Sequence, residues 1–246
     1  MGTLLLRLAG PMQSWGTQSR FSIRDTGLKP SKSGVIGLLC AALGKPRDEA
    51  HSDNIGKPSL AQLTALRMGV RVNHEGVMQK DYHTAGGVNR RGEIYGVVKA
   101  SGAKGDPVPS TRYYLADADF LVGLESENNE LLRQLDRALA QPHWQLFLGR
   151  KSFVPALPVR LPRESDGSFF LLSLEEALRY DWPLDPTYKE SKLRVVIEPK
   201  QSDPEAFEVR CDVPLSFARR QFSIRYVKTT WFEPEEGVES DGTRFE

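Results

Sequence analysis

The chain has 246 residues, of which 39% are hydrophobic and 26% charged, and these values fit one large globular domain or two small ones. No apolar run approaches the roughly 20 residues that span a bilayer, and the N-terminal LLLRL is too short and too interrupted for a signal peptide. A membrane protein is therefore excluded and a cytoplasmic one expected, while the net charge of +1 by itself points to no strongly charged partner.

The first predicted element is a strand over residues 3–8, an apolar run that leads into the segment GPMQSWG. Trp15 in this segment has two alternative roles: stacking on a nucleic-acid base, or packing as an anchor in the core. A tryptophan directly after a strand is more often an anchor, so we take Trp15 mainly as the residue that fixes the loop. Gln13 stays a candidate for a hydrogen bond to a base.

A buried helix is predicted over residues 34–43, which are apolar nearly all round, with Ser33 as its N-cap. The free N–H groups and the positive dipole end of such a helix favour an anion. Lys32 adds a positive charge, and Gly34 lets a phosphate approach the backbone. The sequence therefore predicts a phosphate site here, although it is not a Walker loop. The alternative is an ordinary capped helix with a solvated lysine.

A strand over residues 65–73 precedes a long polar and basic segment, residues 75–111, which is rich in glycine. A loop of this length inside a compact domain is usually functional or mobile. Aromatic residues interleave with bases in and just after it, a pattern that suits unstacked RNA. Tyr82 and His83 alternatively form a general acid/base pair that cleaves RNA at a 2′-hydroxyl. The third alternative is a mobile loop with incidental aromatics.

Residues 113–124 are predicted to form a strand, residues 127–140 an amphipathic helix and residues 146–148 another strand. With the preceding elements the order is β-α-β-β-α-β, the ferredoxin-like arrangement and also the topology of the RNA-recognition motif. Arg150 follows the last strand in the sequence GRKS, where it contacts a backbone phosphate or belongs to a solvated turn.

After about residue 155 the pattern becomes β-rich, with strands predicted over residues 193–198, 206–211 and 222–230. The four histidines are scattered, and there is no C-x-x-C, H-x-x-x-H, G-x-S-x-G or G-x-G-x-x-G motif, so no metal and no cofactor are predicted. Cys40 and Cys211 are expected to be buried thiols of a reducing compartment rather than a disulfide.

Charge is unevenly distributed along the chain. Residues 231–246 hold six acids against Arg244 alone, which makes this segment an acidic tail. Basic residues cluster in residues 7–32, 149–163 and 215–228, where Asp25 is the sole acid. Such clusters are what a phosphate-binding surface needs, although each is also compatible with a solvated face.

Six separated motifs carry a resemblance to a known family. They are LRLAGPMQSWG, PSKSGVIGLL, KDYHT, RYYLADADF, FLGRKS and LSFARRQF, and they occur in order along most of the chain. Together they resemble the CasD subunits of the type I-E CRISPR surveillance complex, Cascade, members of the RAMP superfamily. The acidic tail and the glycine-rich stretch 101–109 lie outside the resemblance.

The resemblance implies an α+β fold with a ferredoxin-like, RRM-like palm (1–74 and 112–155) and an inserted β-rich thumb (75–111). A smaller β-rich C-terminal region (156–230) and the acidic tail (231–246) complete the expected organisation. The resemblance also implies that the chain works in a ribonucleoprotein complex that acts in antiviral defence. The implied partners are the 5′ handle of the CRISPR RNA, the CasC filament that the chain would cap, CasA, CasB, CasE and, through the complex, target DNA.

The main hypothesis is a non-catalytic, RNA-binding assembly subunit with no catalytic residue. The alternative is an endoribonuclease that processes precursor CRISPR RNA with Tyr82 or His83 in acid/base roles. The candidate RNA contacts are Gln13, Arg20, Arg24, Lys32, Ser33, Gly34, Tyr82, His83, Arg90, Arg112, Arg150 and Arg219.

Overall fold

A computed structural model of the chain describes residues 1–16, 22–96, 98, 101–103, 106–161, 169–179, 192–200 and 208–232. Arg20 and nearly all of the acidic tail lie outside the described residues. Within the described part of the chain, no helix has the length and apolar character needed to cross a membrane.

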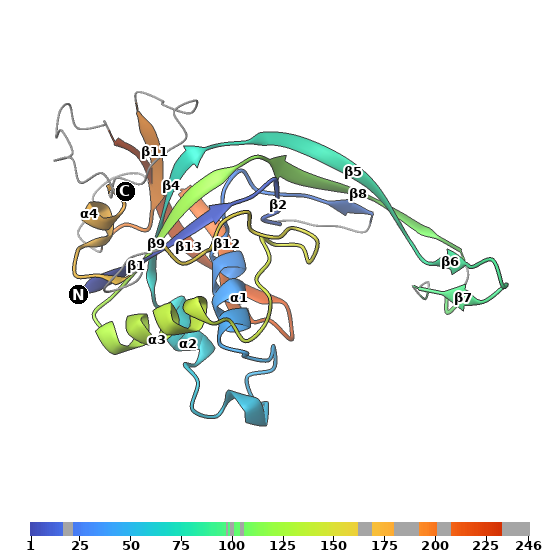
Figure 1. Ribbon diagram of the computed structural model, residues 1–246, viewed down its shortest axis with the longest axis horizontal. Coiled ribbons are helices and arrows are strands. Elements are labelled where there is room, and N and C mark those ends of the chain that lie inside the picture. The colour runs from blue at the N-terminus through green and yellow to red at the C-terminus, as the bar shows by residue number, and fades with distance from the viewer. Residues whose placement is uncertain are drawn as a thin grey trace, which may run out of the picture.

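The main sheet of the described chain has seven strands in the order β10–β1–β9–β4–β11–β13–β12, and all neighbours pair antiparallel. The chain is therefore α+β, with the strands far outnumbering the helices (Figure 1). The strands are β1 (Gly2–Ala9), β4 (Arg67–His74), β9 (Asp119–Ser126), β10 (Phe169–Phe170), β11 (Leu193–Ile197), β12 (Glu208–Ser216) and β13 (Gln221–Phe232).

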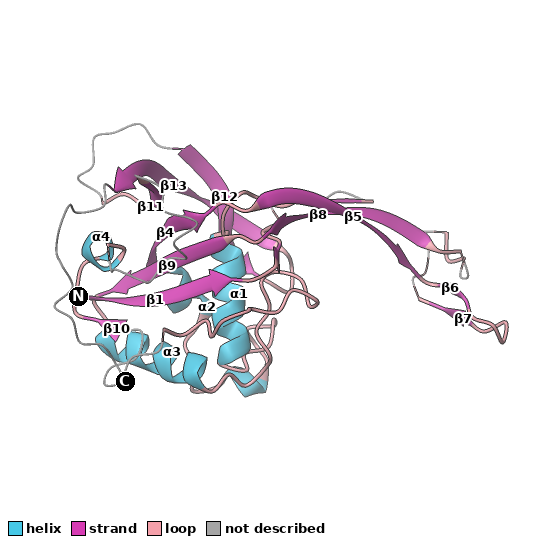
Figure 2. Cartoon of the chain, turned by 45° about the horizontal axis from the view of Figure 1, so that its top comes forward, coloured by secondary structure: helices cyan, strands magenta, loops and turns pink. Residues whose placement is uncertain are grey.

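Helices cover both faces of this sheet (Figure 2). The first face carries α1 (Lys32–Ala42), α2 (Leu60–Thr64) and α3 (Asn129–Ala140), and the second carries the short α4 (Leu174–Ala177). Leu4, Leu6 and Leu8 of β1 pack in the core under the first face, whereas Leu5 packs with α4 on the second. Burial on both faces explains why β1 is an apolar run rather than an alternating one.

A second sheet extends from the body as a long arm made of β5 (Val77–Ala85) and β8 (Val108–Ala116) (Figure 1). β2 (Met12–Gln13) and β3 (Ile23–Arg24) pair with β8, and β6 (Gly87–Val88) pairs with β7 (Ile94–Tyr95) near the tip of the arm. Residues 75–111, which read as a loop from their own pattern, thus contain strands. Most β5 side chains are exposed, so apolar residues do not alternate with polar ones to reveal the strand.

Three sequence-based expectations need correction, and they concern residues 113–124, residues 146–148 and Cys211. Residues 113–124 form two strands in different sheets, because the chain turns at Asp117, whose φ of 55° is left-handed. No strand forms over residues 146–148; β10 lies beside β1 instead. Residues 156–230, predicted as a β-rich C-terminal region, contribute β10 and β11–β13 to the main sheet. Cys40 is a buried thiol as expected, but Cys211 is exposed.

Candidate nucleic-acid interface

Three arginines from separate parts of the chain meet beside the arm, and we call them the arginine cradle: Arg24, Arg112 and Arg150. β3 pairs in parallel with β8 and sets Arg24 beside Arg112 in the register, so both side chains leave the same face of the sheet. All three were predicted as RNA contacts. They line a cavity of about 320 Å³ with Ser14, Gly16, Asp25 and Gly149.

A tight turn presents Arg150 to the cavity. The Phe153 amide donates to the Arg150 carbonyl (2.9 Å), and the Arg150 guanidinium lies 5.4 Å from the centre of the Phe153 ring. Gly149 has a φ of +94°, and a Cβ there would lie 1.8 Å from the Ser14 carbonyl oxygen. The turn can approach the segment after β1 this closely because residue 149 is glycine.

The cradle carries positive charge that is not paired within the described residues. In the part of the chain that the structure describes, none of the three guanidinium groups is bridged to a carboxylate. Burial lowers the pKa of Arg150, and the nearby Arg112 lowers it further, while Asp81 opposes them. Arg112 donates its Nε to Ser110 Oγ (3.0 Å), and its two Nη groups have no partner among the described residues. Planar guanidinium groups of this kind suit the oxygens of a phosphate.

The arm places Tyr82 and His83 on opposite faces. In the β5–β8 register Tyr82 lies opposite Thr111 and His83 opposite Ser110, and neighbouring residues of a strand point to opposite sides. His83 therefore shares the face of Arg112, whereas Tyr82, whose side chain is 73% exposed, lies on the other face. The two side chains do not form an acid/base pair across one substrate.

The N-terminus of α1 differs from the sequence-based expectation. The helix begins at Lys32, and Ser31 rather than Ser33 is the N-cap, accepting a hydrogen bond from the Gly34 amide (3.2 Å). The Ser33 hydroxyl lies inside the first turn, 3.3 Å from the Ser31 hydroxyl. A shift of two residues at a helix end is within the usual uncertainty of sequence-based boundaries.

A carboxylate already occupies the anion position at this helix end. The Lys32 amide donates to Asp212 (2.8 Å), and the buried Lys32 ammonium donates to Glu198 (2.9 Å). Arg225 bonds both acids, at 2.6 Å to Asp212 and 2.9 Å to Glu198. Burial lowers the pKa of Lys32, although Glu198 opposes the shift. These four residues, the α1 ion-pair cluster, correct the prediction of a phosphate site at Lys32, Ser33 and Gly34.

Trp15 is confirmed as a packing anchor, and Gln13 is a core residue rather than a base contact. The Gln13 amide donates to the Leu8 and Ala118 carbonyls (2.8 and 2.6 Å), and its oxygen accepts from the Trp15 indole (3.2 Å). A Cβ on Gly34 would lie 2.8 Å from the Trp15 ring. Gly34 therefore serves the close approach of α1 to Trp15, because no larger side chain fits there.

Comparison with known proteins identifies the family. The model of the CRISPR-associated protein (Cas_Cas5) family matches residues 3–228. The chain belongs to this Cas5 family. The CRISPR system Cascade subunit CasD of Escherichia coli (strain K12) is 34% identical over 155 residues. That alignment covers 61% of this chain and 65% of CasD, which is less than two thirds of the CasD length.

Two solved structures resemble this Cas5-family chain along almost its whole length. A structure described as a crystal structure of a Cas protein is 38% identical, covers 95% of this chain and 96% of its own, and superposes with a TM-score of 0.67. A chain of a CRISPR RNA-guided surveillance complex is 33% identical, covers 94% of this chain and 90% of its own, and reaches a TM-score of 0.71. Both are similar in fold and in sequence.

The remaining candidates of this Cas5-family chain lie apart from the cradle or outside the described residues. Arg90 is exposed in the turn between β6 and β7, and Arg219 is exposed in the turn between β12 and β13. Arg20 lies outside the described residues. The glycines that shape the cavity, Gly16 and Gly149, were missed as functional residues, although each lies within a motif that the sequence analysis singled out. The described residues contain no His/Cys/Asp/Glu group that could hold a metal.

Proposed function

We propose that this Cas5-family chain is a CasD-type subunit of a CRISPR RNA-guided surveillance complex, in the cytoplasm, and that it binds the guide RNA without cutting it. The observation that carries the proposal is the arginine cradle, because it concentrates positive charge that no described carboxylate bridges. The similarity to CasD and to a chain of a solved surveillance complex supports the same assignment.

We further infer that β10–β1–β9–β4, with α1 and α3 on one face, is a ferredoxin-like palm, and that the arm is its thumb. A single RNA strand lying in the angle between palm and arm would meet the cradle and then the His83 face of the arm. The partner set follows the family resemblance: the 5′ handle of the CRISPR RNA, the CasC filament, CasA, CasB, CasE and, through the complex, target DNA.

The alternative, an endoribonuclease acting through Tyr82 and His83, is not favoured, because the two side chains point away from each other. Incubating the protein with precursor repeat RNA tests it directly. We expect the RNA to remain intact. Specific cleavage that disappears in His83→Ala would establish the nuclease instead.

The binding test uses the purified chain and a labelled RNA that carries the repeat-derived handle. We expect Arg112→Ala to weaken binding and to reduce the steepness of the salt dependence by about 0.7, the value for one lost phosphate contact on a single strand. Arg137→Ala is the matched control, because Arg137 is an exposed arginine on α3 paired with Glu130 (2.8 Å). Equal affinity for RNA with and without the handle would overturn the handle assignment, and an unchanged salt dependence in Arg112→Ala would overturn the cradle.

A further inference from the structure

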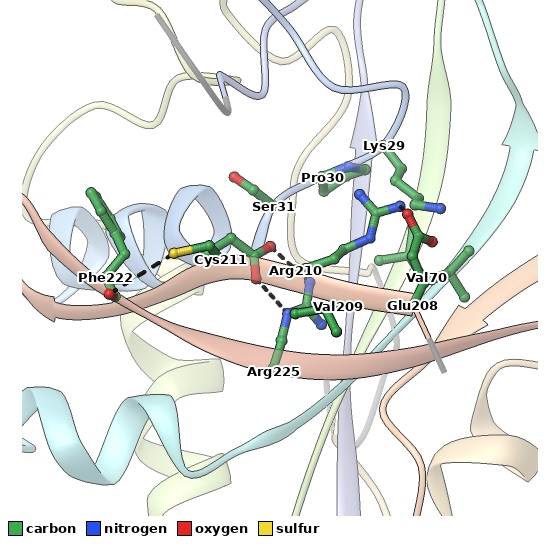
Figure 3. A pocket seen from close by; sticks show the side chains of 12 residues that line it. Lys29, Pro30, Ser31, Val70, Glu208, Val209, Arg210, Cys211, Phe222 and Arg225 are labelled. Atoms are coloured by element: carbon green, nitrogen blue, oxygen red, sulfur yellow. Dashed lines mark hydrogen bonds and ion pairs between the residues drawn. The ribbon is translucent and has the colours of Figure 1, made fainter. Parts of the chain in front are cut away.

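A second cavity, of about 510 Å³, opens on the same face of the main sheet as α1 (Figure 3). Its floor includes Val70 of β4 and Val196 of β11, and one wall is the β12–β13 hairpin. The opposite wall is the segment 29–31, which leads into α1. We call it the Lys29 pocket. It shares no lining residue with the cavity of the arginine cradle.

The two ends of the Lys29 pocket have different chemistry. Lys29, Arg210 and Glu208 gather at one end, and the Phe222 ring lies at the other (Figure 3). Phe222 is 40% exposed, so its ring is available to a ligand. A cavity of this size takes a ligand larger than a bare phosphate. The shape and lining suit a molecule with an anionic group at one end and a flat ring at the other.

The basic end has donors that the described protein does not use. Lys29 forms no hydrogen bond or ion pair with any described residue. Arg210 donates one Nη to Glu208 (2.6 Å), but its buried Nε has no partner among the described residues. Arg225 is different, because Asp212 and Glu198 already bridge it. An anion in the pocket would supply a partner for the Lys29 ammonium, and the nearby Arg210 guanidinium adds a second positive charge.

The charged Lys29 ammonium lowers the stability of the folded chain. Burial lowers its pKa to about 8; Arg210 lowers it too, Glu208 opposes, and Arg194 and Arg225 add to the lowering. Its folded-state pKa lies below the unfolded value of 10.5, so the folded state gains stability as pH rises from about 8 through 10.5. At neutral pH the charged ammonium therefore disfavours folding, which a bound anion would reverse.

We propose that the Lys29 pocket binds a nucleoside monophosphate unit, with its phosphate on Lys29 and Arg210 and its base against Phe222. The unit is either a free mononucleotide or the terminal nucleotide of an RNA. The proposal does not depend on RNA binding at the arginine cradle. Base-aromatic stacking tolerates any base, so no particular nucleotide is required.

The test is calorimetric titration of the full chain with AMP, GMP, CMP and UMP at pH 7 and low salt, with inorganic phosphate in parallel. We expect saturable binding of nucleotides and weaker binding of phosphate. Lys29→Met should weaken nucleotide binding about tenfold or more, the range for a charge-assisted hydrogen bond. Phe222→Ala should weaken it about fivefold or more. Lys29→Arg should restore most of the affinity, and Lys80→Ala, an exposed lysine on β5, should leave it unchanged.

A melting curve separates a binding role from a structural one. Lys29→Met should melt at a higher temperature than the parent chain, because it removes a charge that burial disfavours. A lower melting temperature, no saturable nucleotide binding, or equal affinity in Lys29→Met would each overturn the proposal. Phosphate that binds as tightly as the nucleotides would overturn the nucleotide class.

The source of the nucleotide is tested in the double variant Arg112→Ala/Arg150→Ala. Because this variant lacks two cradle arginines, any RNA binding that remains can be assigned to the Lys29 pocket. A short linear RNA with a 5′-phosphate that displaces AMP, when the same RNA in circular form does not, identifies a terminal nucleotide. If neither RNA displaces AMP, the free mononucleotide is the ligand. Displacement by the circular RNA would contradict a pocket for a single nucleotide.

Discussion

The arginine cradle and the α1 ion-pair cluster both bring together cations from distant parts of the chain. Among the described residues, carboxylates pair with the cations of the α1 ion-pair cluster but not with those of the cradle. Lys32 and Arg225 face two carboxylates at 2.6–2.9 Å. The cradle arginines have Asp25 and Asp81 nearby, without an ion pair to them among the described residues. A basic side chain can bind a ligand when the fold gives it no carboxylate partner. Counting basic residues along the sequence does not show which side chains these are.

The largest effect should come from breaking the α1 ion-pair cluster. Asp212→Ala removes the acceptor of the Lys32 amide and of two Arg225 donors, and leaves Arg225 buried with less compensation. We expect the free energy of unfolding to fall by about 3–5 kcal/mol in urea denaturation. Asp53→Ala, at an exposed aspartate, is the control. A loss below about 1 kcal/mol would contradict a structural role for the cluster.

The cradle should show the opposite pattern, with a loss of binding and little loss of stability. Arg112→Ala should weaken RNA binding by about 1.5–3 kcal/mol, roughly ten- to a hundredfold, and change the free energy of unfolding by less than about 0.5 kcal/mol. A filter-binding titration and a urea denaturation curve on the same preparation check both. If the free energy of unfolding falls as much as the binding free energy, Arg112 stabilises the fold, as Lys32 and Arg225 do, and is not mainly an RNA contact.

Arg67 is another arginine paired with carboxylates, and its ion pairs make the stability of the fold depend on pH. Arg67 bonds Glu175 at 2.6 Å and Glu125 at 3.0 Å. Burial alone would raise the pKa of Glu175, but the hydrogen bond from Arg67 prevails and lowers it to about 2. Because the folded-state pKa of Glu175 lies below its usual value of 4.5, this contribution is present above pH 4.5 and is lost as pH falls toward 2.

The Glu175→Gln variant tests whether this contribution to stability is lost between pH 4.5 and pH 2. The free energy of unfolding of the parent chain should exceed that of the variant by about 1 kcal/mol above pH 5, since partial exposure of Glu175 screens the pair. The difference should shrink between pH 4.5 and pH 2, as followed by urea denaturation at each pH. A difference that stays constant over this range would show that the carboxylate charge is not involved.

The smallest effect should be that of Lys32 on RNA binding. The Lys32 ammonium is buried and bonded to Glu198, so it has no donor within reach of a nucleic acid. Lys32→Met should leave RNA affinity within about twofold of the parent chain, provided that circular dichroism shows a folded protein. A tenfold loss of RNA affinity in a folded Lys32→Met variant would show that Lys32 contacts the RNA after all.

The regular elements of the body were largely predictable from sequence. The predicted helix over residues 127–140 is α3, and strands predicted over 3–8, 65–73, 193–198 and 222–230 each correspond to an observed strand. These segments bury a regular apolar pattern, which is the signal that sequence analysis reads. The arm was not predictable in this way, because β5 is exposed along nearly its whole length and carries no apolar period.

The family motifs, the buried helix after the first strand and the surplus of bases can all be read from the sequence alone. Which of these bases can bind a ligand depends on the folded structure. Lys32 meets Glu198 and Asp212 across 166 and 180 residues of chain, whereas Arg24 and Arg112 meet through the parallel register of the short β3 with the long β8. A charged side chain can bind a ligand only where its neighbours in space leave it unpaired, and contacts over such separations form only when the sheet assembles.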